Sequence, residues 1–388
     1  MRRACSFFCL EAIAAQDASR RLSRVRSSHR GGVLAAGDER EVAASLAART
    51  LVWLARAMTT PPLQPHETIW TLTNAVIPST CLHVIAELGI ADFIGDAPAD
   101  ESELASRCGV DAGALGRVLG LLCDHGVFER ADGGFRHSAA SELLRTDHPM
   151  SMRGFPRMMG LPVFQTVIDR LSHSVRTGSP SMDTVEPNGL WAYLQARPGE
   201  YEVFGQAMTA KAVADIAAVL GAYDFGKFGM IADVGGGRGH LLRAVLDSFP
   251  AAEGVLFDLP EVIAAVDFQH ERLTTQAGDF FANDLPSANA YVLMEVLHDW
   301  PDDACLTILR GIRRAARPGA TVVVIENVIA EDRPDPRGRT LDIVMLAVTG
   351  GRERTATDLS VLFEHAGLAV GQVVETAGPL RIVEAVAP

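Results

Sequence analysis

This sequence of 388 residues is poor in lysine, in paired cysteines and in long apolar runs. Its only lysines are Lys211 and Lys227, against 35 Lys and Arg residues in total. The six cysteines form no C-x-x-C pair and have no histidines interleaved at metal-ligand spacing, so we expect a reduced, cytoplasmic chain that holds no metal. No apolar stretch reaches the length of a membrane span, which argues against a membrane protein. The net charge of -13 argues against nucleic acid as a partner, because a duplex-binding surface needs a basic face.

The first sixty residues differ in composition from the rest. They are rich in Arg, Ser and Ala and lack an apolar period, so we predict a disordered extension over 1–60. A short apolar patch after the opening Met-Arg-Arg imitates a signal peptide, but Glu11 interrupts it. The scarcity of lysine fits a GC-rich genome, in which reading frames extend upstream by accident. We therefore expect translation to start naturally at Met58.

The most informative segment is 231–242, where an apolar strand ends at Asp233 and leads through glycines into a helix over 240–249. Glycines at 235, 236, 237 and 239 permit positive φ and the close approach of a ligand. The free N–H groups of the helix would point at that ligand. The spacing is G-x-G-x-G and not the G-x-G-x-x-G of dinucleotide binders, which favours S-adenosylmethionine. An NAD-dependent enzyme is the nearest rival within this part of the chain.

Two further predicted strands also end in acids. The strand over 254–260 ends near Asp258, whose carboxylate can accept both hydroxyls of a ribose. In the block 277–281, Asp279 could take an adenine amino group and Phe280 could cover the ring face. Three acids at successive strand ends predict one cofactor site.

These blocks, followed by Val-Leu-His-Asp-Trp at 296–300 and Gly-Gly-Arg-Glu-Arg-Thr at 350–355, resemble the S-adenosylmethionine-dependent O-methyltransferases of the caffeate/hydroxyindole type. The resemblance runs from about Thr68 to the C-terminus. It implies S-adenosylmethionine as cofactor, S-adenosylhomocysteine as product, an aromatic small-molecule acceptor and a homodimer. It places the cofactor against Asp233, Gly235, Gly237, Asp258, Leu259, Gly278, Asp279, Phe280 and Met294. At Met294 the sequence departs from many relatives, which carry a lysine four residues before the His-Asp-Trp histidine.

Methyl transfer to a hydroxyl needs one base to take the acceptor's proton. His298 follows an apolar strand, and in the family this histidine is the general base. An imidazole with its ordinary pKa near 6.5 is mostly unprotonated at neutral pH. The resemblance also places Glu326 and Glu353 beside the base, although Glu353 could instead pair with the arginines next to it. The fold family includes members with other chemistry such as hydroxylation, and retention of all three residues argues against that alternative.

Two blocks resemble the family's acceptor pocket. Phe204 and Met208 match Phe-x-x-x-Met, and Met345 matches Leu-Asp-x-x-Met. Flexible thioethers suit flat aromatic ligands, although apolar residues at this spacing also face a helix core.

Strands expected near 230, 255, 274, 291 and 322 alternate with helices and are followed by a helix over 357–366 and a closing pair near 370 and 382. This pattern predicts an α/β fold, a doubly wound, mostly parallel, Rossmann-like methyltransferase sheet.

Residues 101–125 read as helix-turn-helix and 128–136 as a β wing. A winged helix suggests a transcription regulator, our second hypothesis, but its second helix offers only Arg117 to DNA. In the resembling family this α-helical module instead dimerises. The expected domains are the extension 1–60, the dimerisation domain 61–150, a helical connector and pocket wall 151–222, and a catalytic domain 223–388.

Overall fold

The computed structural model describes residues 64–388, so the predicted extension and the expected start at Met58 lie outside the described residues. A division between two compact units falls after Thr73, and each unit is treated by itself. From the first unit the structure describes the start of helix α3 (Pro65–Asn74). The fold and the candidate site described below belong to the second unit, residues 74–388.

The N-terminal part of this unit is the predicted winged helix. Asp100 and Asp111 cap its two central helices by accepting bonds from the N–H groups of Ser102 and Ala114. The wing is an antiparallel hairpin that turns at an Asp-Gly-Gly sequence. The elements in order are α4 (Val76–Leu88), η1 (Ile90–Phe93), α5 (Glu101–Cys108), α6 (Ala112–Asp124), β1 (Phe128–Ala131), β2 (Gly134–His137) and α7 (Ala139–Glu142).

A helical segment follows and leads to the sheet. Its last helix, α12, is 25 residues long and carries Phe204 and Met208. The elements are α8 (Gly154–Met159), α9 (Pro162–Asp169), α10 (Leu171–Thr177), η2 (Ser181–Thr184), α11 (Gly189–Gln195) and α12 (Pro198–Ala222).

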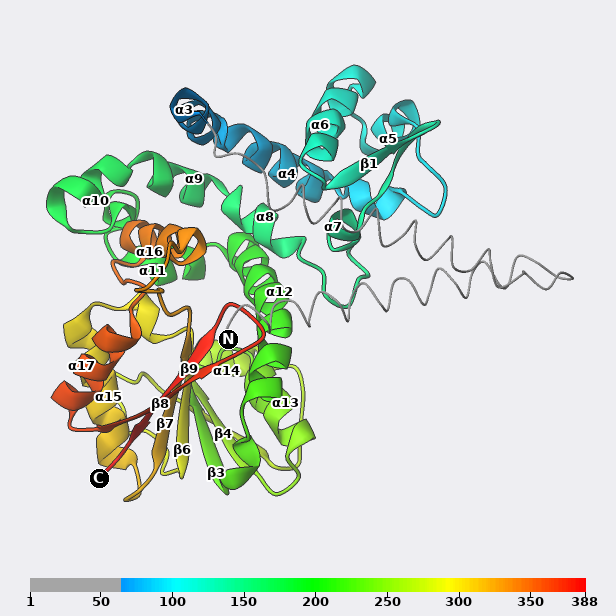
Figure 1. The fold of residues 1–388 in the computed structure, drawn as a ribbon. Helices are drawn as coiled ribbons and strands as arrows, with labels where there is room; N and C mark the ends of the chain where they lie inside the picture. Colours follow the sequence, from blue (N-terminus) through cyan, green and yellow to red (C-terminus); the bar gives the residue numbers. More distant parts are fainter. Residues whose placement is uncertain (1–63) are drawn as a thin grey trace, which may run out of the picture. The chain divides into compact units, whose positions relative to one another are not determined.

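The C-terminal part is a seven-stranded sheet in the order β5-β4-β3-β6-β7-β9-β8, with helices on both faces (Figure 1). The strands from β5 to β7 in this order pair in parallel, and β9 is antiparallel to both β7 and β8, so the predicted mostly parallel, doubly wound sheet is confirmed. The strands are β3 (Met230–Val234), β4 (Glu253–Asp258), β5 (Leu273–Ala277), β6 (Ala290–Met294), β7 (Thr321–Glu326), β8 (Ala369–Glu375) and β9 (Arg381–Val386). The other elements are η3 (Phe225–Lys227), α13 (His240–Ser248), α14 (Pro260–Ala264), η4 (Leu297–Asp299), α15 (Asp302–Ala315), α16 (Pro336–Val348) and α17 (Ala356–Ala366).

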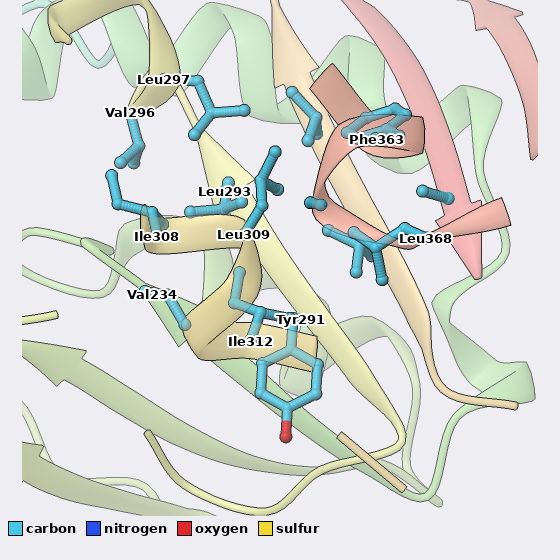
Figure 2. Close-up of a cluster of buried hydrophobic side chains, with 14 of the residues drawn as sticks. Val234, Tyr291, Leu293, Val296, Leu297, Ile308, Leu309, Ile312, Phe363 and Leu368 are labelled. Carbon is cyan, nitrogen blue, oxygen red and sulfur yellow. The ribbon is translucent and has the colours of Figure 1, made fainter. Parts of the chain in front are cut away.

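Apolar clusters cover both faces of the sheet because the central strands are hydrophobic on both sides. One cluster packs the sheet against α15 and α17, and Val296 and Leu297 belong to it (Figure 2). These two residues directly precede His298. Because the interior is close-packed, burial of these two residues fixes the position of the segment that carries the candidate base.

Two expectations need correction. The sequence predicts a helix over 301–316 with Pro301 in its first turn, because proline suits that position. Pro301 instead lies at the N-cap of α15, since helical backbone angles begin only at Asp302. In addition, residues 65–88 and the helix Pro198–Ala222 are long and apolar enough, by length and composition, to cross a membrane. The statement that no stretch reaches that length was therefore wrong. This is weak evidence for a membrane, because core helices of soluble proteins pass the same test.

Candidate active site

The loop after β3 has a backbone that requires glycine. Gly235, Gly237 and Gly239 have φ of 70°, 59° and 77°, a region that residues with a Cβ disfavour. A Cβ on Gly236 would lie 2.5 Å from the Oδ2 atom of Asp233. The loop leads into α13, whose first N–H groups have no partner within the helix. A ligand can therefore approach the backbone closely here and meet hydrogen-bond donors.

Two carboxylates flank this loop. Asp233 is 1% exposed, and neither of its oxygens makes a full hydrogen bond among the described residues; the carboxylate receives only a weak interaction from the backbone N–H of Leu242, in the first turn of α13, which acts to lower its pKa. Burial raises the pKa of Asp233 to about 7, with the nearby negative charge of Asp258 as a smaller cause. Asp258, at the end of β4, accepts bonds from the N–H groups of Gly237 at 2.8 Å and Leu259 at 2.7 Å. The structure thus joins Asp258 to Gly237 and Leu259 by hydrogen bonds and leaves the buried carboxylate of Asp233 without a cationic partner among the described residues.

The turn after β5 carries the other predicted cofactor residues. Gly278 is buried, and a Cβ there would lie 2.7 Å from the ring of Phe257. The Oδ1 atom of Asp279 accepts a bond from the N–H of Phe281 at 2.8 Å, which fixes the turn. Phe280 makes edge-to-face contacts with Phe281 and with Trp300, at centroid distances of 4.8 and 5.9 Å. The sequence analysis assigned no role to Phe281 or Trp300, and these rings join the turn to the segment that carries His298.

His298 lies in η4 at the carboxyl end of β6. Its Nδ1 atom is 3.0 Å from the Oε1 atom of Glu353, and its Nε2 atom is 3.8 Å from the Oδ1 atom of Asp299. Burial acts to lower the pKa of His298, but Asp299, Glu353 and Glu326 outweigh it and raise the pKa to about 9. The sequence analysis took the ordinary value near 6.5, because the carboxylates around the ring come from distant parts of the chain. In the free protein the imidazole is therefore mostly protonated at neutral pH.

The two flanking glutamates make different contacts. Glu353 is 1% exposed and contacts the imidazole directly. Glu326, equally buried at the end of β7, makes no hydrogen bond to the ring among the described residues, because its Oε2 atom has no hydrogen-bond partner there. Its Oε1 atom instead accepts bonds from the backbone N–H groups of Leu297 at 2.7 Å and His298 at 3.1 Å. Glu353 therefore acts on the ring, and Glu326 holds the backbone that carries it.

Arg354 also holds this segment, although the sequence analysis gave it no role. It is 1% exposed and donates bonds to the carbonyl oxygens of Leu297 and Trp300, each at 2.8 Å, and to Asp302 at 2.7 Å. Nearby, a Cβ on Gly351 would lie 2.0 Å from the carbonyl oxygen of His298. These contacts give a physical reason for the Gly-Gly-Arg-Glu-Arg-Thr block, which the sequence alone presented only as a motif.

The predicted acceptor residues lie on two helices. Phe204 and Met208, on α12, are partly buried and pack against one apolar cluster, to which α9, α11 and α16 also contribute. Trp191, on α11, contacts the ring of Phe204 edge-on at 5.7 Å. Met345, on α16, is partly buried, and its sulfur lies 4.0 Å from the Oγ1 atom of Thr349. The first two residues share a cluster, and Met345 is not a member of it.

Met294 ends β6 and packs against the apolar layer between the sheet and α12 and α13. The position at which many relatives carry a lysine is therefore apolar here. The next residue, Glu295, forms an ion pair with Lys211 of α12. The sequence analysis missed this pair, because 84 residues separate its members in the chain.

Two family models match the chain. A model described as an O-methyltransferase domain matches residues 169–369, and one described as an O-methyltransferase dimerisation domain matches residues 70–147. The chain is also 37% identical over 311 residues to phenazine O-methyltransferase of Lysobacter antibioticus, which covers 78% of this chain and 91% of that relative.

Solved structures with the same fold include two that contain the cofactor or its product. A methyltransferase of calicheamicin biosynthesis, in its S-adenosylhomocysteine-bound form, matches with a TM-score of 0.76 and 32% identity, over 85% of this chain and 100% of that one. Human N-acetylserotonin methyltransferase in complex with S-adenosylmethionine matches with a TM-score of 0.77 and 28% identity, over 84% and 99%.

Proposed function

The chain belongs to the S-adenosylmethionine-dependent O-methyltransferase family, and from this premise we propose that it methylates a phenolic hydroxyl of an aromatic or polyketide-like small molecule, with His298 as the general base. The observation that carries the proposal is the bond between the imidazole Nδ1 atom and Glu353. A carboxylate at Nδ1 favours a proton on that nitrogen, which leaves Nε2 to accept the acceptor's proton.

The residues at the carboxyl edge of the sheet fit the cofactor. A Cβ on Gly236 would fill the cradle beside Asp233, and the buried carboxylate of Asp233, which no cation pairs with among the described residues, suits a cationic ligand. S-adenosylmethionine, when bound, supplies an electrophilic methyl group on a sulfonium. We assign its binding to Asp233, Gly235, Gly237, Asp258, Leu259, Gly278, Asp279, Phe280 and Met294.

The raised pKa of His298 suits the proposed proton transfer. A phenol has a pKa near 10, and the imidazolium, with a pKa of about 9, lies close to it. Proton transfer between groups of similar pKa is only slightly uphill, whereas an imidazole of pKa 6.5 would be a much weaker base. Glu353 stabilises the imidazolium that forms, and Glu326 holds the backbone of the base in place.

The acceptor class rests on the candidate pocket residues Phe204, Met208 and Met345 and on relatives. An aromatic ring and flexible thioethers suit a flat aromatic molecule. The related enzyme of Lysobacter is named as a phenazine O-methyltransferase, and the human relative as an N-acetylserotonin methyltransferase. Both names point to aromatic acceptors.

We further propose a cytoplasmic homodimer with no nucleic acid and no membrane among its partners. The match to a dimerisation domain supports the dimer, as do exposed apolar side chains on α4 such as Val76 and Ile77. The winged helix is a poor DNA reader, because α6 carries Arg117 as its only basic residue. The domain boundaries at 60, 150 and 222 are part of the same proposal.

The test compares the wild-type protein with His298→Gln in assays with S-adenosylmethionine and a panel of phenols, detecting S-adenosylhomocysteine by mass spectrometry. We expect turnover to fall on the order of 10²- to 10⁴-fold, because proton removal is lost. Calorimetric binding of S-adenosylhomocysteine should stay nearly unchanged. The matched control is His365→Gln, on the exposed side of α17. Unchanged turnover in His298→Gln would remove the imidazole from the reaction.

A further inference from the structure

One of the two lysines of the chain lies in a mostly buried cluster of charges. The side chain of Lys211 is 15% exposed, and its Nζ atom contacts a carboxylate oxygen of Glu295, whose side chain is 16% exposed. The same Nζ atom lies 3.8 Å from the Oδ2 atom of Asp215, one turn further along α12 and 6% exposed. Burying three charged groups together is costly unless they pair, so this cluster needs a reason beyond solubility.

Glu295 has an unusual backbone. Its φ of 55° makes it the only residue other than glycine with positive φ among residues 64–388. Such a conformation persists in a residue with a Cβ only where the surroundings hold it, and such residues cluster at functional sites. Here the N–H of Glu295 donates a bond to the carbonyl oxygen of Ile325 at 2.9 Å, and the carboxylate pairs with Lys211. Glu295 lies between β6 and the segment that carries His298.

The partner helix carries residues of the candidate acceptor pocket. Phe204, Met208, Lys211 and Asp215 follow one another at intervals of four, three and four residues along α12. On an α-helix this spacing places all four side chains along one face. The Lys211–Glu295 contact therefore connects the face that carries the acceptor residues to the segment that carries the base.

We propose that Lys211 is a positioning residue for the reaction: its ammonium group, paired with Glu295 and Asp215, fixes the distance between the acceptor face of α12 and His298. This inference rests on the proposed function. No contact of Lys211 with the acceptor is required.

The ammonium also acts on the charges around the base. The carboxylates that face Lys211 are Glu295, Asp215 on α12, Glu326 on β7, Asp299 beside His298 and Glu353 after α16, and the cationic Arg337 on α16 also faces it. If Lys211 loses its charge, the carboxylates around His298 lose a compensating cation. The imidazolium is then stabilised, and the pH at which His298 gives up its proton should rise.

The experiment compares Lys211→Met, Lys211→Arg and the charge exchange Lys211→Glu/Glu295→Lys, with Lys227→Met as the matched control. Lys227 precedes β3, at the opposite end of the strands, and pairs with Glu384. We expect Lys211→Met to lower kcat by about tenfold or more, as misplacement of reacting groups does, with S-adenosylhomocysteine affinity nearly unchanged. Lys211→Arg should recover most of this loss and the exchange part of it, while Lys227→Met should match the wild type.

A second readout does not depend on activity. The titration of His298, followed by ¹⁵N NMR and assigned with His298→Gln, should move to higher pH in Lys211→Met and return in Lys211→Arg. A wild-type kcat and titration in Lys211→Met would overturn the inference, as would an equal loss in Lys211→Arg. If Lys211→Met does not fold, the other two variants give the answer: near wild-type kcat in Lys211→Arg and partial activity in the charge exchange support the inference, and a large loss in Lys211→Arg overturns it. A failure of the proposed function gives a different pattern, since no phenol would then be methylated by the wild type while the NMR titration still reports on Lys211.

Discussion

Replacement of Glu326 separates the structural part of the site from its electrostatic part. The side chain is 1% exposed, and its Oε1 atom accepts the N–H groups of Leu297 and His298. In Glu326→Ala both donors lose their acceptor inside the protein. In Glu326→Gln the amide oxygen can still accept both bonds, but the negative charge is gone. Glu326→Ala therefore removes the hydrogen-bond acceptor of the two backbone N–H groups, whereas Glu326→Gln removes only the negative charge.

The expected magnitudes follow from these contacts. A buried donor left without an acceptor costs about 1–3 kcal/mol, so Glu326→Ala should lower the free energy of unfolding by about 2–6 kcal/mol. Relief of the buried carboxylate, whose pKa burial raises, acts in the opposite direction and favours the lower part of that range. Because the proposed base His298 then loses its position, turnover should fall on the order of 100-fold. Glu326→Gln should change the free energy of unfolding by less than about 1 kcal/mol, because both bonds are kept.

The pH profile tests the charge. Glu326 is one of three carboxylates that raise the pKa of His298 to about 9. Without its charge that pKa falls, so the acidic limb of kcat/KM should move to lower pH in Glu326→Gln. The assays are urea denaturation and kcat/KM between pH 6 and 10, with the exposed Glu364→Ala on α17 as control. If Glu326→Ala unfolds at the same midpoint urea concentration as the wild type, Glu326 does not support the backbone of Leu297 and His298 in the way described. A limb that stays in place or moves to higher pH in Glu326→Gln would refute the electrostatic part.

Three further predictions concern the same site. Gly236→Ala should weaken S-adenosylhomocysteine binding by about tenfold or more in calorimetry, because the new Cβ meets Asp233, whereas Gly199→Ala on α12, with open space around it, should bind normally. Arg354→Met should lower the melting temperature and reduce the free energy of unfolding by about 2–4 kcal/mol, because the carbonyl groups of Leu297 and Trp300 lose a buried donor, while the exposed Asp302 is solvated by water; an unchanged melting temperature would contradict this. In the wild type, kcat/KM should rise with pH through about 9, because only the neutral imidazole acts as a base; a plateau already reached at pH 7 would show that the carboxylates do not raise the pKa of His298.

Most of the fold could be predicted from the sequence because its signals are local. Short strand patterns of five or six residues, most of them apolar, alternate with helical patterns, and the five predicted parallel strands lie where they were expected. The winged helix could also be predicted, since Asp100 and Asp111 are helix caps and the wing turns at an Asp-Gly-Gly sequence. Pro301 shows the limit of such signals. Proline suits both the end of the preceding loop and the first helical turn, so the boundary stayed uncertain by one residue.

The site could be predicted only in part, because its contacts join distant segments. Motifs brought His298, Glu326 and Glu353 together as candidates, but nothing in the sequence indicates that one glutamate contacts the ring and the other the backbone. The pKa of the base depends on carboxylates that only the folded sheet places around it. Lys211 and Glu295 carry no motif signal at all, because a buried ion pair is recognisable only when both residues are located in space.

The charge balance of the site connects cofactor binding to the state of the base. Asp233 has a pKa near 7 because it is buried, and His298 has a pKa near 9 because carboxylates surround it. A positive charge placed nearby lowers both values, since it favours the carboxylate and disfavours the imidazolium. By linkage, a cationic ligand then binds more tightly as pH rises, whereas S-adenosylhomocysteine, whose sulfur is neutral, lacks that sulfonium contribution. Under the proposed function, a sulfonium bound near both groups would stabilise the buried carboxylate and lower the pKa of the imidazole, and we expect His298 to lose its proton at lower pH in the loaded enzyme than in the free one.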